Sequence, residues 1–277
     1  MSLETRFHRL VFPLTRWIYR HADAIVVYGE HVKRYLVSLH VAPEKIFIAG
    51  HAVDNAQYNR AIAEGEKTAL RNKLGLNRKK AVLYLGRLEE EKGVDYLIRA
   101  FARLNSHDVV LLLVGDGSMR ENLEALVLEH GIQKRIRFVG YVPPEEALTY
   151  YAIADLFVLP SVTMPTGREP WGLVVNEAMN QGLPVVATEA VGAAAGGLVQ
   201  SGVNGFIVPE RDPIALAEAI GRILNDDGLR QEMSRNARRI VASWDNERMV
   251  QGFQQAIAYA LRKRQRDIGC GNISSTY

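Results

Sequence analysis

From Ala81 onward, short apolar runs alternate with segments of helical period, and this alternation constrains the fold more than any other feature. Several runs are apolar without interruption, which is typical of parallel strands that helices cover on both faces. The runs that we interpret as strands are Ala81–Leu85, Val109–Val114, Ile136–Val139, Leu156–Leu159, Pro184–Ala187 and Phe206–Val208. Strands that alternate with helices at this spacing predict an α/β fold with a doubly wound parallel sheet, in which ligands bind at the carboxyl ends of the strands.

The segments between the strands carry helix signals. One amphipathic helix is predicted by a single apolar stripe, formed by Val94, Leu97, Ile98, Phe101 and Leu104. Ser118 followed by Glu121 predicts a capping box that opens a helix over Met119–Glu129, and Gly131 would end that helix. Pro213 stands at the first turn of another predicted helix.

The first 60 residues follow a different pattern, with strands at Ala24–Val27 and Ile46–Ala49 and a helix at Glu30–Leu39 between them. Such a unit is too small to enclose a core alone, so we interpret it as a partial N-terminal α/β remnant of a preceding domain. A last helix is predicted over Asn246–Leu261. We therefore expect four parts, namely the remnant, a Rossmann-like domain, the last helix and a disordered tail, at residues 1–52, 53–243, 244–262 and 263–277.

An apolar stripe near the N-terminus has three interpretations. It consists of Phe7, Leu10, Val11, Leu14, Trp17 and Ile18, and Pro13 interrupts it. It could pack against the rest of a domain, lie on a membrane surface as a basic amphipathic helix, or form an oligomer contact.

Composition narrows the class of protein. A share of 48% apolar and 23% charged residues is ordinary for a globular chain, and a net charge of +3 is too weak to argue for nucleic acid. The single cysteine, Cys270, fits a reducing compartment, and no apolar run reaches the roughly 18 residues of a membrane span. The basic N-terminal segment does not resemble a signal peptide. We expect a cytoplasmic protein, either free or peripheral at the inner face of the membrane.

The first motif with chemical meaning follows the strand at Ala81–Leu85. Gly86 and Arg87 come directly after the strand, and Lys92 stands at the start of the next helix. Glycine allows close approach of an anion, and the helix N-terminus and the two cations would hold a diphosphate. The alternative is an ordinary strand–turn–helix with solvated basic residues. The three spaced glycines of a dinucleotide fingerprint are missing, which disfavours a nicotinamide oxidoreductase.

Two further strand ends carry weaker signals. Gly115, in a Gly-Asp-Gly-Ser turn, could give backbone contact with a ligand, although a tight turn into a helix explains it nearly as well. The segment from Val139 to Tyr141 ends a strand, where free backbone groups could pair with a nucleobase. A plain strand end before Pro143 is the simpler interpretation.

The most informative motif places two carboxylates, Glu169 and Glu177, around the start of a helix near Gly172. The first-turn amides at Gly172 and Leu173 could bind a phosphate. Residues eight apart lie roughly 12 Å apart along a helix, far more than the ~5–5.5 Å between the two carboxyl groups of a retaining hydrolase. The two glutamates therefore suggest two contacts along one extended ligand, and two solvated glutamates beside a packing aromatic residue are the alternative.

Together these segments resemble glycosyltransferase family 4, which has the GT-B fold. The resemblance runs from about Ala22 to Arg262 and rests on ADAIVVYGEHVKRYL, GRLEEEKGVDYLIRAF, LLLVGDGSMRENLE, IRFVGYVP, ADLFVLPS, EPWGLVVNEAMNQGLPVVAT and GVNGFIVPERD. It implies transfer of a sugar, with retention of configuration, from a UDP-sugar or GDP-sugar to a glycan or lipid-linked acceptor, as in polysaccharide biosynthesis. No nucleic acid, metal or further cofactor is implied.

The resemblance also implies roles for the residues that would hold the diphosphate. Arg87 and Lys92 would bind it and stabilise the leaving group, since negative charge develops where these cations already stand. Gly86 would let the backbone approach it, and Gly172 and Leu173 would support it through their backbone amides. Arg87, Lys92 and the sugar-binding Glu169 are the expected catalytic residues.

The remaining roles lie along the same donor. Glu177 would bind the ribose hydroxyls, and Glu169 would contact the donor sugar. Gly115 would offer backbone contact, and Val139 and Tyr141 would face the base. Family members usually carry a complete N-terminal acceptor domain, of which only residues 1–52 are expected here. The alternative function is therefore an inactive nucleotide-sugar-binding or interaction fragment that needs a separate N-terminal domain or an oligomeric partner.

Overall fold

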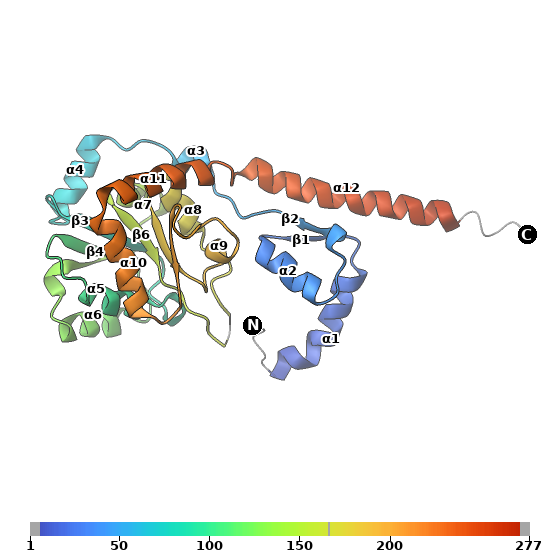
Figure 1. The fold of residues 1–277 in the computed structure, drawn as a ribbon, viewed down its shortest axis with the longest axis horizontal. Helices are drawn as coiled ribbons and strands as arrows, with labels where there is room; N and C mark the ends of the chain where they lie inside the picture. The colour runs from blue at the N-terminus through green and yellow to red at the C-terminus, as the bar shows by residue number, and fades with distance from the viewer. Residues whose placement is uncertain (1–5, 166, 272–277) are drawn as a thin grey trace, which may run out of the picture. The chain divides into compact units, whose positions relative to one another are not determined.

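The computed structural model describes residues 6–165 and 167–271. The chain divides into two compact units (Figure 1). Unit 1 comprises Met1–Ala52 and Trp244–Tyr277, and unit 2 comprises Val53–Ser243.

Unit 2 is built on a six-stranded parallel sheet with the strand order β5-β4-β3-β6-β7-β8. The strands are β3 (Lys80–Leu85), β4 (Val109–Val114), β5 (Ile136–Gly140), β6 (Leu156–Leu159), β7 (Val185–Thr188) and β8 (Gly205–Val208). Each predicted strand is present, with bounds that differ by no more than one residue. The doubly wound α/β fold that the sequence predicts is therefore confirmed.

Continuous apolar runs form these strands because the sheet is covered on both faces. Every residue of β4 is buried. The aromatic rings of Tyr151 and Phe157, 5.8 Å apart, fill part of the core beside β6. On one side α5, α6 and α10 pack together, at Val94–Ala102, Arg120–Glu129 and Pro213–Asn225. On the other, α7, α8, α4 and α11 pack together, at Pro144–Ile153, Leu173–Asn180, Glu64–Lys73 and Asp227–Val241.

The strand order creates a switch point between β3 and β6. From β3 the chain moves outward through β4 to β5, and then returns to place β6 on the other side of β3. Right-handed crossovers put the helices of these two halves on opposite faces of the sheet. The loops after β3 and β6 consequently diverge, and this is where open α/β sheets bind ligands.

The predicted capping box at Ser118 is wrong. Helix α6 follows Met119 at its N-cap position, and no side chain caps it. The Ser118 hydroxyl instead donates to the carboxylate of Glu89 at 2.6 Å, and the Ser118 amide donates to the same carboxylate at 3.1 Å. Ser118 thus ties the loop after β4 to the loop after β3, a tertiary contact that local sequence spacing does not encode.

Three short or polar helices were not predicted, namely α3 (Asn55–Tyr58), α4 and α9 (Gly192–Ala195). Helix α4 has no buried residue, so its sequence carries no apolar stripe. Helices α3 and α9 are single turns, too short to show a period.

Unit 1 contains a two-stranded parallel sheet with helices around it. Its elements are α1 (Arg6–His21), β1 (Ile25–Val27), α2 (Glu30–Ser38), η1 (Pro43–Lys45), β2 (Ile46–Ile48) and α12 (Asn246–Gly271). A small core forms from Val27, Leu36, Val41 and Ile46. Much of the apolar face of α1 remains exposed, including Leu14 and Trp17.

The last helix is longer than predicted. We expected it to end at Leu261 and a disordered tail to begin at residue 263, but α12 continues to Gly271. Within unit 1, Lys263 and Arg264 contact Asp23 at 3.2 and 3.3 Å, which extends the helix by ionic contacts beyond its apolar stripe. Residues 272–277 of the predicted tail lie outside the described residues. Among the described residues, no helix has both the length and the apolar character needed to cross a membrane.

Candidate functional site

The predicted site residues follow four strands that are adjacent in the sheet. Gly86 follows β3, Gly115 follows β4, Tyr141 follows β5, and Glu169 lies in the loop after β6. The order of these strands is β5-β4-β3-β6, and all are parallel. Their carboxyl ends therefore share one edge of the sheet, which is the arrangement that the sequence analysis expects.

Backbone hydrogen bonds connect these loops to one another. The Gly86 amide donates to Val114 O at 3.0 Å, and the Gly115 amide donates to Gly140 O at 2.8 Å. The amide of Val162, in the loop after β6, donates to Glu91 O at 2.9 Å. The four loops are thus held together by main chain, independently of their side chains.

The close approach of two loops explains the glycine at position 115. A Cβ atom there would lie 1.9 Å from Gly86 O, closer than any real contact. The backbone at Gly115 also has φ +129°, which disfavours other residues. Packing therefore accounts for Gly115 by itself, and its predicted contact with a ligand stays a prediction.

Two of the expected catalytic residues are bonded to each other. The Lys92 ammonium donates to the carboxylate of Glu169, and their side chains are only 17% and 10% exposed. The Ser161 hydroxyl lies 3.4 Å from the same carboxylate oxygen. Lys92 belongs to the turn η2 (Glu90–Lys92) after β3, and Glu169 to the loop after β6, so the ion pair spans the switch point. The sequence analysis assigned these residues to different parts of one ligand and did not foresee their contact.

Arg87 stands apart from this pair. Its guanidinium contacts Glu91 at 2.9 Å, and its side chain is 69% exposed. The buried Tyr84 hydroxyl donates to Arg87 O at 2.5 Å and fixes the backbone of the loop. Burial, together with the charge of Glu169, raises the pKa of Tyr84 well above its usual range, so this hydroxyl stays a donor. The charge of Arg87 therefore lies at the sheet edge on a firmly held loop.

Helix α8 begins beside the same loop. Gly172 at its N-cap has φ +85°, no side chain caps the helix, and a Cβ at Gly172 would lie 2.7 Å from Leu159 Cδ2. The Val175 amide donates to Gly172 O at 2.9 Å, whereas the amides of Leu173 and Val174 precede the first acceptor of the helix. A helix end of this kind attracts anions, because the N–H groups and the helix dipole act together. The buried Trp171 indole donates to Asn176 Oδ1 at 2.9 Å and anchors the turn.

Glu177, one turn into α8, is held by tyrosines that the sequence analysis missed. The Tyr151 hydroxyl donates to Glu177 Oε2 at 2.8 Å, and Tyr58 also bonds this carboxylate. Burial raises the pKa of Glu177, while the two hydroxyl groups oppose that rise. Burial and the nearby Glu177 carboxylate raise the pKa of Tyr58 to about 12. Tyr58 and Tyr151 lie 119 and 26 residues before Glu177 in the chain, so no local pattern marks them.

The residues expected to face a base lie at the far side of the same edge. Val139 is half-buried in β5, and Tyr141 directly follows the strand with its side chain 76% exposed. Beside them in β5, the Phe138 ring has the Arg120 guanidinium of α6 5.6 Å from its centre. The position is open to a flat ligand, and the contact itself stays a prediction.

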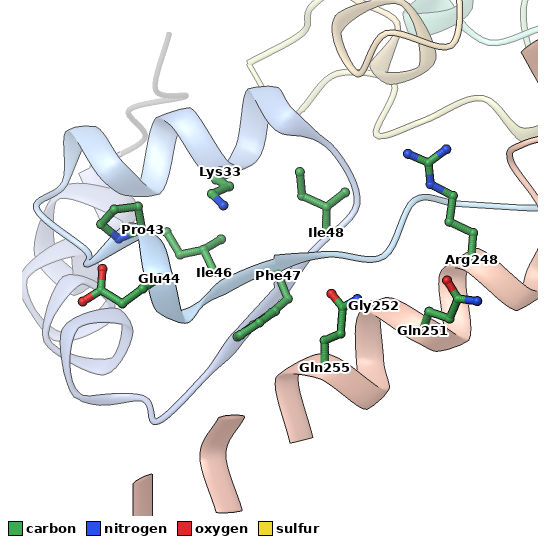
Figure 2. A pocket seen from close by; sticks show the side chains of 10 residues that line it. All are labelled: Lys33, Pro43, Glu44, Ile46, Phe47, Ile48, Arg248, Gln251, Gly252 and Gln255. Carbon is green, nitrogen blue, oxygen red and sulfur yellow. The ribbon is translucent and has the colours of Figure 1, made fainter. Parts of the chain in front are cut away.

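A cavity of about 400 Å³ lies elsewhere, within unit 1. Figure 2 shows that its lining side chains come from α2, η1, β2 and α12, and they include Lys33, Phe47 and Arg248. No predicted site residue lines it. In the part of the chain that the structure describes, no group of three or more His, Cys, Asp or Glu side chains is placed to hold a metal ion.

The sheet order and the switch-point site define a Rossmann-like lobe of the kind found in GT-B glycosyltransferases. The chain belongs to the family described as glycosyl transferases group 1, whose model matches residues 66–240. An uncharacterized glycosyltransferase of Methanocaldococcus jannaschii is 32% identical over 80% of this chain and 57% of its own length. Alpha-D-kanosaminyltransferase of Streptomyces kanamyceticus is 30% identical over 84% of this chain and 60% of its own length.

Among solved structures, Anabaena HepE in complex with UDP has a TM-score of 0.78 and 26% identity, covering 95% of this chain and 70% of its own. The same protein in complex with UDP-glucose has a TM-score of 0.74 and 26% identity, covering 92% and 69%. By comparison, the chain spans only 57% and 60% of the length of the two curated relatives, the Methanocaldococcus jannaschii glycosyltransferase and the kanosaminyltransferase.

Proposed function

We propose that this chain binds a nucleoside-diphosphate sugar at the carboxyl edge of its sheet and belongs to a retaining glycosyltransferase. The observation that carries this proposal is the Lys92–Glu169 ion pair across the switch point, next to the uncapped start of α8. A cation, a carboxylate and free helix amides at one sheet edge offer complementary contacts to an anionic diphosphate and to sugar hydroxyls. The UDP and UDP-glucose bound by HepE support this choice of ligand.

The proposed contacts run along the donor in order. Arg87 and Lys92 bind the diphosphate and offset the charge that develops when it leaves. The Leu173 amide supports the same group. Glu169 accepts hydrogen bonds from the sugar hydroxyls once Lys92 turns to the diphosphate, and Glu177 accepts from the ribose hydroxyls. Val139 and Tyr141 lie at the end of the edge where the base would rest.

Transfer to a glycan or lipid-linked acceptor is the whole enzyme's proposed reaction. The glycosyltransferase names of both curated relatives support a transfer reaction, and the sugar-transferring kanosaminyltransferase supports a hexose-like donor. Retention of configuration is tested by NMR of the product formed from an α-linked donor. An α-linked product supports the proposal, and a β-linked product contradicts it.

Binding is tested by titration calorimetry of the chain with UDP and with GDP. We expect one of them to bind, and Arg87→Ala to weaken that binding by about 10-fold or more, because a hydrogen bond between charged groups contributes roughly 1.5–3 kcal/mol. Lys67→Ala is the matched control. It also removes one positive charge and breaks an ion pair within one element, because Lys67 contacts Glu64 on α4. Equal losses in both variants, or no binding of either nucleotide, would refute the proposed site.

Turnover is measured separately, as release of UDP or GDP from the corresponding sugar donor by the same chain. Nucleotide binding without any donor turnover would assign binding to this chain and place the reaction with a longer or assembled protein.

A further inference from the structure

Two adjacent residues after β8 hold the loop that carries Glu169. The Glu210 carboxylate accepts from the Thr163 amide, and the Arg211 guanidinium donates to Thr163 O at 2.5 Å. The two side chains also contact each other, with Arg211 Nη1 2.9 Å from Glu210 Oε2. Both main-chain polar groups of Thr163 are therefore bound by one ion pair, which we call the Thr163 clamp.

The backbone of the clamp is strained. Arg211 has φ +60°, in the left-handed region that residues with a Cβ avoid. Among the described residues, the other non-glycine residues with positive φ are His40 and Asn77. Strain that persists at a residue with two polar side-chain contacts indicates that the contacts are worth more than a relaxed backbone.

Thr163 lies where the two halves of the switch point meet. The neighbouring Val162 amide donates to Glu91 O in the loop that carries Lys92. Ser161, two residues before Thr163, contacts Glu169 through its hydroxyl and accepts from the Thr188 hydroxyl through its carbonyl. A shift of Thr163 would therefore move both partners of the ion pair.

The loop passes from the core to the surface at Thr163. Ser161 and Val162 are buried, whereas a surface cavity of about 170 Å³ lies beside Val162, Met164 and Arg211. The clamp therefore holds the loop at the point where it leaves the core.

We propose that Glu210 and Arg211 are positioning residues that set Glu169 and Lys92 in place for the sugar of a nucleotide-sugar donor. This inference rests on the proposed function, because it assumes that a donor sugar meets Glu169. The clamp touches only the loop after β6, whereas Arg87 and the start of α8 are held by other contacts. Its loss should therefore weaken binding of the sugar more than binding of the nucleotide.

The test compares the affinities of UDP and UDP-glucose by calorimetry, with GDP and GDP-mannose as a second pair. Arg211→Gly removes the guanidinium but relieves the positive φ, so the two effects partly offset and the melting temperature should fall only slightly. We expect the ratio of sugar-nucleotide to nucleotide affinity to fall at least fivefold, with a smaller loss of the nucleotide affinity itself, because Lys92 also meets the diphosphate. Asn77→Gly is the matched control, because it also relieves a positive φ in unit 2 but lies outside the clamp.

A conservative change separates positioning from general stability. Glu210→Gln keeps an acceptor for the Thr163 amide and should retain most of the wild-type ratio, while Glu210→Ala should lose it. An unchanged ratio in Arg211→Gly, or an equal loss of both affinities in Glu210→Ala, overturns the inference and leaves the proposed function standing. Failure of the wild-type chain to bind any of the four probes overturns the proposed function and the inference with it.

Discussion

The Lys92–Glu169 ion pair predicts a measurable coupling between its two members. At about 4 Å and an effective dielectric constant of 20, unit charges attract by about 4 kcal/mol, but desolvation offsets much of this. Removing one member of a buried pair costs about 3–5 kcal/mol because the other charge is stranded. These side chains keep 17% and 10% exposure, so we expect about 2–3 kcal/mol for Lys92→Ala and for Glu169→Ala.

The double variant should cost about 3 kcal/mol, well below the sum of the single changes, because no charge is stranded. The expected coupling energy is therefore about 2 kcal/mol. Urea unfolding measures it, with Trp171 as the reporter, since this residue lies in unit 2 and is only 3% exposed. Trp17→Phe and Trp244→Phe, both in unit 1, make Trp171 the single tryptophan of the chain. Single costs that add within 0.5 kcal/mol would refute the reasoning, because independent sites behave in that way.

Two further predictions concern Glu177 and two glycines with positive φ, Gly115 and Gly197. Burial raises the pKa of the Glu177 carboxyl above its ordinary value of 4.5. Above pH 4.5 the folded chain therefore binds more protons at this group than the unfolded chain. The free energy of unfolding consequently falls as the pH rises from 4.5 towards the pKa of the folded state. Glu177→Gln should therefore be stabilising near pH 7 and not at pH 4, measured by thermal unfolding. In urea unfolding, Gly115→Ala should lower the free energy of unfolding by about 3 kcal/mol or more, and Gly197→Ala by about 1 kcal/mol. Both glycines have positive φ, but only at Gly115 would the added Cβ clash with backbone, at Gly86 O. Equal costs would contradict the steric argument.

The sheet was predictable because its strands are buried on both faces. β4 and β6 are apolar at every position, so their bounds agree with the prediction to the residue. Helices were predictable only where they bury a stripe. Helix α4 has no buried residue, so the apolar pattern did not reveal it. Helix α12 continues beyond its apolar residues, where Lys263 pairs with Asp23, so the pattern predicted too short a helix.

The candidate site was predictable as a set of loops and not as a network of contacts. A parallel sheet brings strand ends to one edge, which is why Gly86, Gly115 and Glu169 could be grouped from the sequence. Which side chains pair depends on strand order and loop path. The Tyr151 contact with Glu177 and the clamp on Thr163 join residues far apart in the chain, and such contacts leave no local signal.

The interlocked glycines have a consequence for how a site of this kind can change. Gly86 and Gly115 meet through main chain, so that part of the edge presents a surface that substitutions at other positions leave intact. Exposed side chains around this surface, such as Tyr141, can change without disturbing the frame beneath them. Exchange of the exposed groups can then change which ligand this edge binds without rebuilding the main-chain frame.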